Sequence, residues 1–318
     1  MKSQDFLPRF CEKPISGATL NKRKPLTVCI SAICEHGLIV GAADRMLTFN
    51  KGETEFELKA TSTGDNFTFK ITPVNSAKNV VMMMAGNTSF QSEIALMIIH
   101  HIEKRELAGN IRLTVAETVE MYIEIYNQKR AKYVEGVFLK PLGLDTPEFL
   151  KQLSSFPTGY AEAITKQMTD FDFSQGVQTI ITGIDDEGSH LYSLNENNPT
   201  CFDATGYAAI GIGENHAKSQ FMLNNYTRIV PQEEALWLVY MAKRKAEIAG
   251  GVGKITDLFR IGPKDKKCVL LNHLEPQLTR IYSGYEKRAN SSFKTAQKSV
   301  KSYLQSLSVS KEKNKRTH

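Results

Sequence analysis

The sequence predicts an α+β protein in which two antiparallel β-sheets stack face to face and helices cover their outer surfaces. Strand-like runs come in pairs joined by short polar turns, which is typical of antiparallel hairpins. Paired amphipathic segments of helical length separate these hairpins along the chain. Strands and helices are thus grouped rather than alternating singly, which favours segregated layers over a parallel sheet.

Two hairpins open the predicted domain. Apolar runs at 28–33 and 38–43 flank the turn Glu35-His36-Gly37, and the first hairpin ends on Asp44. The second hairpin joins "FTFKITPV" to "VVMMMAG" through the polar turn "NSAKN". The alternation in its first strand turns Lys70 away from the neighbouring apolar residues.

Two helices are expected next, because apolar residues recur at helical spacing in 88–106 and 114–133. We interpret Thr88 or Ser89 as the cap of the first helix. The second begins at Thr114, where Glu117 completes a capping-box pattern.

The second half repeats the order of hairpin and helices after an irregular insert. Three prolines break up residues 136–174, where we expect one or two short helices. A strand pair resumes at 177–195, and a strand, glycine turn and helix follow at 201–223. His216 is interpreted as a surface residue of that helix. A long helix at 231–250 and two final strands complete the domain.

Length and apolar content fit a sizeable folded unit. The chain has 318 residues, 41% of them hydrophobic, so it can bury one large core or two smaller ones. Its longest apolar runs, such as 80–85 and 94–99, are far shorter than the roughly 20 residues that a membrane helix needs. The N-terminal residues lack an apolar signal core. We therefore expect a protein that is not exported by that route and has no membrane partner.

The cysteines and histidines give no sign of a metal site. No CxxC pair and no zinc-type spacing occurs, so we predict no metal, and we expect no cofactor. The chain has five cysteines: Cys11, Cys29, Cys34, Cys201 and Cys268. This odd number favours a reduced, cytoplasmic protein.

Charge separates the end of the chain from the rest. The formal net charge is +6, but residues 286–318 hold nine Lys or Arg against two Glu, a net of +7, so residues 1–285 sum to −1. This balance argues against a nucleic-acid-binding fold. We predict an N-terminal extension at 1–25, a folded domain at 26–285 and a basic, partly helical tail at 286–318. The tail could contact an anionic partner, although a solvated terminus is the simpler interpretation.

Four motifs, taken in order, resemble those of a known family. They are "TVCISAICEHGLIVGAADRMLT", "FKITPV…VVMMMAGNTSF", "TIITGIDDEGSHLYSLN…YAAIGIGENHA" and "IAGGVGKITDLFRI". Together they resemble the β-type subunits of proteasomes and their bacterial relatives, which are N-terminal-nucleophile (Ntn) hydrolases. The resemblance covers about residues 26–275, outside the insert. It implies a four-layer αββα sandwich and assembly into a ring-like homo-oligomer.

The resemblance also implies a catalytic set. Thr27 would be the nucleophile of a threonine-type peptidase, and its own α-amine would act as base once the extension, a propeptide, is removed. Lys70 would stabilise the developing alkoxide and Asp44 would hold that lysine. Backbone near Gly86 would bind the oxyanion or the substrate, a peptide or a protein.

Departures from the family pattern keep other readings open. Leu26 precedes Thr27 where the family has glycine, and Ile212, Ala246 and Ala249 replace polar residues. These differences favour a catalytically inactive scaffold or binding subunit that keeps its extension, with a structural ion pair between Asp44 and Lys70. A non-peptide amidase of the wider class is a third reading. One extra residue between Gly37 and Asp44 leaves the register of Thr27 open.

Overall fold

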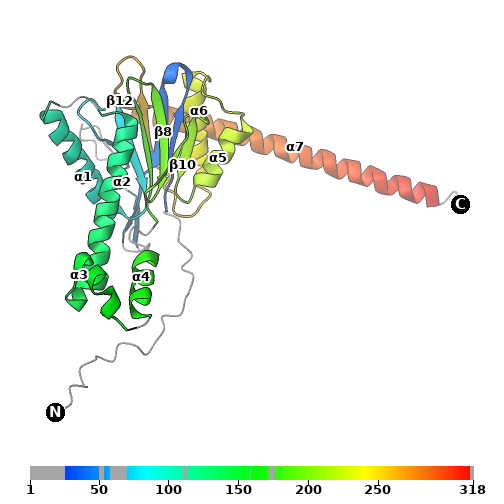
Figure 1. Ribbon diagram of the computed structural model, residues 1–318. Coiled ribbons are helices and arrows are strands. Elements are labelled where there is room, and N and C mark those ends of the chain that lie inside the picture. Colours follow the sequence, from blue (N-terminus) through cyan, green and yellow to red (C-terminus); the bar gives the residue numbers. More distant parts are fainter. Residues whose placement is uncertain are drawn as a thin grey trace, which may run out of the picture.

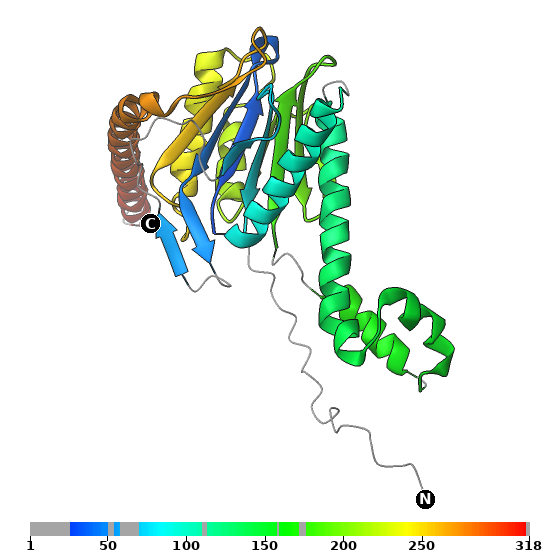
Figure 2. The same cartoon turned by 90° about the vertical axis from the view of Figure 1, so that its left-hand side faces the viewer.

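The computed structural model describes residues 26–49, 54–57, 70–109, 113–157, 159–171 and 176–315. The predicted extension at 1–25 lies outside these residues, as do positions 67–69 of the second predicted hairpin. Two five-stranded antiparallel sheets form the centre of the molecule, and helices lie on the outside (Figures 1 and 2).

The first sheet contains the opening hairpin. Its β1 and β2 pair without interruption from Cys29↔Ala43 to Ile33↔Ile39, and the 3₁₀ turn η1 (Glu35–Gly37) lies between them. In spatial order, its strands are β10 (Tyr207–Ile210), β1 (Cys29–Ile33), β2 (Ile39–Asp44), β11 (Thr256–Ile261) and β12 (Cys268–Leu270).

The second sheet contains the second hairpin and the strand pair that follows the insert. In spatial order, its strands are β5 (Ile71–Pro73), β6 (Val80–Ala85), β7 (Gln178–Ile184), β8 (Ser189–Asn195) and β9 (Asn198–Cys201). β3 (Met46–Phe49) and β4 (Thr54–Glu57) form a separate two-stranded ribbon, and neither strand was predicted from the sequence.

Three apolar cores define four layers. Alternate residues of β1 and β2 face either the helix pair α5 (Glu214–Leu223) and α6 (Gln232–Ala246) or the second sheet. The other face of the second sheet packs against α1 (Thr88–Leu107) and α2 (Val115–Val134). The prediction of an α+β protein with two stacked antiparallel sheets is confirmed at this level.

The helix caps agree with the sequence in one case and differ in the other. Thr114 and Glu117 form the predicted capping box of α2. The cap of α1 is Asn87, whose side chain accepts hydrogen bonds from the N–H groups of Ser89 and Phe90. The prediction of Thr88 or Ser89 was therefore wrong, because Asn87 keeps an extended backbone while Thr88 is already helical and buried.

The insert extends α2 into a small helical lobe (Figure 2). The π-helical turn η3 (Glu135–Leu139) and the 3₁₀ turn η4 (Lys140–Leu142) lead to α3 (Thr146–Lys151), η5 (Leu153–Ser155) and α4 (Tyr160–Asp170). Leu139, Phe149 and Ile164 form the core of this lobe.

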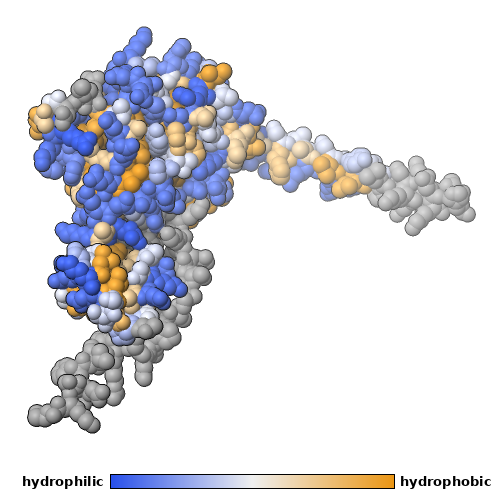
Figure 3. Space-filling view, in the orientation of Figure 1, coloured by the Kyte–Doolittle hydropathy of each residue, from blue (hydrophilic) through white to orange (hydrophobic). Residues whose placement is uncertain are grey.

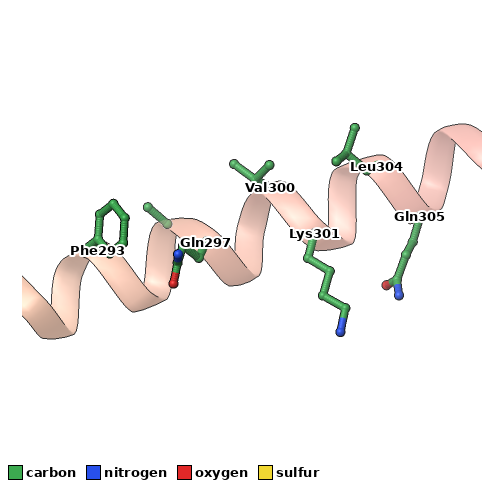
Figure 4. A pocket seen from close by; sticks show the side chains of 7 residues that line it. Phe293, Gln297, Val300, Lys301, Leu304 and Gln305 are labelled. Atoms are coloured by element: carbon green, nitrogen blue, oxygen red, sulfur yellow. The ribbon is translucent and has the colours of Figure 1, made fainter.

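The C-terminal helix, α7 (Glu275–Lys315), follows the 3₁₀ turn η6 (Asn272–Leu274) and starts before the predicted tail. Tyr282 packs against α6, whereas every residue from 287 to 306 is exposed, so the helix projects from the body (Figure 1). Apolar residues gather along one side of this arm (Figure 3), where Phe293, Val300 and Leu304 point the same way (Figure 4). None of the described helices combines the length and apolar character needed to cross a membrane.

Candidate active site

The side chains of Thr27, Asp44 and Lys70 meet between the two sheets. Thr27 lies just before β1 and Asp44 ends β2, so the antiparallel pairing of these strands brings the two together. Lys70 directly precedes β5, the first strand of the second sheet. The β1–β2 register is unbroken, and the Thr27 side chain contacts Asp44; whether Thr27 corresponds to the nucleophile position of the family stays a prediction.

Hydrogen bonds connect all three side chains. The Lys70 ammonium donates to Asp44 Oδ1 at 2.6 Å and also donates to Thr27 Oγ1. The Thr27 hydroxyl in turn donates to Asp44 Oδ1. The positive charge of Lys70 against the threonine oxygen favours ionisation of the hydroxyl, whereas the hydrogen bond from the hydroxyl to the Asp44 carboxylate favours its neutral form.

Backbone N–H groups fix the Asp44 carboxylate from the first sheet and its connections. Val28 N donates to Oδ1 at 3.2 Å, and Gly253 N donates to Oδ2 at 2.7 Å. Met46 N makes a longer contact of 3.4 Å with Oδ2. Both carboxylate oxygens are therefore held, which leaves Asp44 one orientation toward Lys70 and Thr27.

This cluster is sealed from solvent. The exposed fraction is 2% for Thr27, 0% for Asp44 and 4% for Lys70. Leu26 lies against Gly251, since a Cβ added to that glycine would come within 2.8 Å of Leu26 Cβ. Thr27 is joined to Leu26 by a peptide bond, so its nitrogen is an amide in this chain and cannot act as a base.

Gly86 lies where β6 ends and α1 is about to begin. Its φ of +129° is one that side chains rarely allow, and an added Cβ would stand 3.1 Å from Val177 Cα. Close packing against Val177 therefore accounts for this glycine. Its predicted role toward an oxyanion or a substrate stays a prediction.

The segment Gly211–Gly213 packs directly against the nucleophile candidate. A Cβ on Gly211 would be 2.2 Å from the carbonyl oxygen of Thr27, and Gly213 N donates to that oxygen at 3.4 Å. Ile212 and Ala249 pack beside the core between the first sheet and α6, and Ala246 is buried in it. The three positions that depart from the family pattern thus supply apolar packing.

Cys29, two residues beyond Thr27, serves as a small buried hydrophobe. It is fully buried in the core between the sheets, and burial raises the pKa of its thiol to about 12, against a smaller opposing effect of Lys70. The thiol therefore stays protonated at neutral pH. His216 is exposed on α5, as predicted.

No protein-family model and no curated protein matches the chain. The interpretation of the site therefore depends on its own geometry. Within the described parts of the chain, no three His, Cys, Asp or Glu side chains gather into a group that could hold a metal ion.

Sequence reasoning missed several residues that support the site. Gln178 accepts a hydrogen bond from Gly211 N at 2.7 Å and so joins β7 to the segment beside Thr27. Gly253 holds Asp44, as described above. Lys243 is a third residue that supports the site. Its only signal in the sequence is its spacing, because it stands four residues after Val239 on the side of α6 where buried apolar residues recur.

Lys243 is a fully buried cation on α6. Its ammonium donates to Glu247 Oε1 at 2.7 Å and to the carbonyl oxygen of Lys254 at 2.8 Å. Burial lowers the pKa of this ammonium, and the negative charges of Glu247 and Asp44 act in the opposite direction. Asp44 thus has two lysines in its surroundings, Lys70 in contact and Lys243 farther away.

Proposed function

We propose that this chain is an N-terminal-nucleophile hydrolase of the proteasome β-subunit type, which cleaves amide bonds in peptides or proteins. The nucleophile would be the Thr27 hydroxyl after removal of residues 1–26. The contact of this hydroxyl with both Lys70 and Asp44 carries the proposal. Assembly into a ring-like homo-oligomer belongs to the same proposal and follows from the resemblance in sequence motifs, whereas the proposed cytoplasmic location follows from the cysteine content.

The proposed reaction needs only groups of this chain and water. The freed α-amine of Thr27 takes the hydroxyl proton while the oxygen attacks the carbonyl carbon of the substrate. Lys70 stabilises the negative charge that develops, and Asp44 keeps Lys70 charged and oriented. The protonated amine then gives its proton to the leaving nitrogen, which departs with an ester left on Thr27. Water attacks that ester with the same amine as base and restores the hydroxyl.

A second candidate function is an inactive scaffold or binding subunit. Two observations favour it: the sealed cluster around Thr27, and the apolar side chains at Ile212, Ala246 and Ala249. In this case the extension stays attached, and the three buried polar side chains act only as a structural ion-pair network. A non-peptide amidase would need the same freed threonine.

The test compares the intact chain with a chain produced so that Thr27 is its first residue. We expect the shortened chain to hydrolyse a mixed set of fluorogenic peptides and Thr27→Ala in that chain to lose this hydrolysis. Thr256→Ala is the matched control, because this buried threonine pairs with Asp44 across β2 and β11 and its hydroxyl contacts no partner among the described residues. Mass spectrometry of the intact chain shows whether the extension is removed. A folded, shortened chain without Thr27-dependent hydrolysis would favour the scaffold.

A further inference from the structure

Lys243 belongs to a connected path of hydrogen bonds that ends at the candidate active site. Its ammonium donates to the carbonyl oxygen of Lys254 at 2.8 Å. The residue before Lys254 is Gly253, whose N–H donates to Asp44 Oδ2 at 2.7 Å. One short backbone segment therefore joins a buried cation on α6 to the carboxylate that holds Lys70 and Thr27.

The backbone of this segment leaves little room for rearrangement. Gly253 is buried, and a Cβ at this position would stand 2.6 Å from Glu57 Oε1 and 3.3 Å from Asp44 Oδ2. On its other side, Ile255 N donates to Glu57 Oε1 at 2.7 Å. The segment from Gly253 to Ile255 is thus held at three points, by Asp44, Lys243 and Glu57.

The pairing with Glu247 alone does not account for the position of Lys243. Glu247 also lies 3.4 Å from Arg244 Nη1, so this carboxylate has a second cation available. A lysine used only for that ion pair could leave its ammonium in water, where exposed pairs carry little penalty. Instead the side chain is completely buried and donates to the backbone carbonyl oxygen of Lys254.

We propose that Lys243 is a positioning residue of the Thr27 site, which acts by holding Gly253 in place to orient Asp44. This inference rests on the proposed hydrolase function for its catalytic meaning. The structural part of the inference, that Lys243 fixes the Gly253 N–H against Asp44, does not depend on whether the chain is an enzyme. Two kinds of measurement therefore test it.

The variant Lys243→Met removes the ammonium and keeps an unbranched side chain of similar length. Lys245→Met is the matched control, because Lys245 lies on the same helix and pairs with Glu286 at 3.2 Å, away from Gly253. Hydrogen exchange of the Gly253 amide, measured in the full-length folded protein, gives the first readout. We expect at least tenfold faster exchange in Lys243→Met and unchanged exchange in Lys245→Met.

Steady-state hydrolysis by the chain that begins at Thr27 gives the second readout. We expect Lys243→Met to lower kcat at least tenfold with KM changed less than twofold, and Lys245→Met to retain both values. Unchanged Gly253 exchange in a folded Lys243→Met protein overturns the proposal, as does an equal effect of Lys245→Met. If Lys243→Met does not fold, Lys243→Met/Glu247→Gln supplies the same comparison without an unpaired carboxylate. If the unsubstituted shortened chain shows no hydrolysis, the proposed function fails, and the exchange data still decide the role of Lys243.

Discussion

The ammonium of Lys70 and the carboxylate of Asp44 lie 2.6 Å apart although they come from different sheets, and both are almost completely buried. Such a pair is held in place by the penalty for separating it, since either charge alone would be stranded away from water. The contact therefore joins the two sheets at the point where Thr27 lies.

Replacing Asp44 by leucine should destabilise the protein strongly. Lys70 would lose its charged acceptor in a buried site, and breaking a buried pair in this way costs about 3–5 kcal/mol. Urea unfolding of Asp44→Leu measures this loss. The double variant Asp44→Leu/Lys70→Met should be more stable than Asp44→Leu alone, because no charge is stranded. A loss below about 1 kcal/mol in Asp44→Leu, the level of an exposed pair, would contradict the buried pairing.

Alanine at Gly211 should be far more harmful than alanine at Gly143. Both glycines have positive φ, +90° and +75°, but an added Cβ at Gly211 would meet the carbonyl oxygen of Thr27, and at Gly143 it would meet open space. Backbone strain alone predicts a loss of about 1–2 kcal/mol for Gly143→Ala. Gly211→Ala should lose at least about 3 kcal/mol, since a clash with backbone adds to the strain. Thermal or urea unfolding compares the two, and equal losses would show that the packing around Thr27 is loose.

The buried thiol of Cys29 should make stability fall at alkaline pH. Its pKa is raised by burial from 9.0 to about 12, so in that range the unfolded state releases the thiol proton and the folded state keeps it. Stability therefore decreases as pH rises above 9.0, by about 1.4 kcal/mol per pH unit for one thiol. Cys29→Ala should lessen this slope, whereas Cys201→Ala, at an exposed position, should retain it. Urea unfolding below pH 9.0 and midway to pH 12 measures both slopes.

Deleting residues 288–318 should leave the stability of the body unchanged. Every residue from 287 to 306 is exposed, so this part of α7 buries nothing against the sheets or α6. We expect a change within about 0.5 kcal/mol, as for surface substitutions. Tyr282→Ala should instead cost about 3 kcal/mol, because this side chain is 3% exposed and packs on Trp237 and Tyr240. A large loss on truncation would indicate contacts with the body that the exposed side chains do not suggest.

Local patterns predicted the elements that depend on neighbouring residues. The first hairpin followed from two apolar runs and a turn, and the capping box of α2 is complete within Thr114–Glu117. Other strands gave no such signal. The separate ribbon of β3 and β4 was not predicted, and the edge strand β9 is exposed throughout with Pro199 inside it, which is tolerated only at an edge.

Local sequence motifs also selected three residues of the candidate site. Thr27, Asp44 and Lys70 were selected from motifs, and the structure brings them into contact. Lys243 could not be selected, because "KRK" in a helix normally indicates a solvated face. Its burial depends on Glu247 and on the carbonyl oxygen of Lys254, and the latter lies beyond the end of the helix. Only the tertiary fold brings Gly253 to Asp44, more than two hundred positions away.

The projecting part of α7 also affects how the molecule tumbles in solution. Its exposed run from 287 to 306 is 20 residues long and so extends about 30 Å at a rise of 1.5 Å per residue. An arm of this length attached to the body makes rotational diffusion anisotropic, with slower reorientation of the helix axis than rotation about it. A fluorescent or spin label near Ser306 would report this motion, far from Thr27.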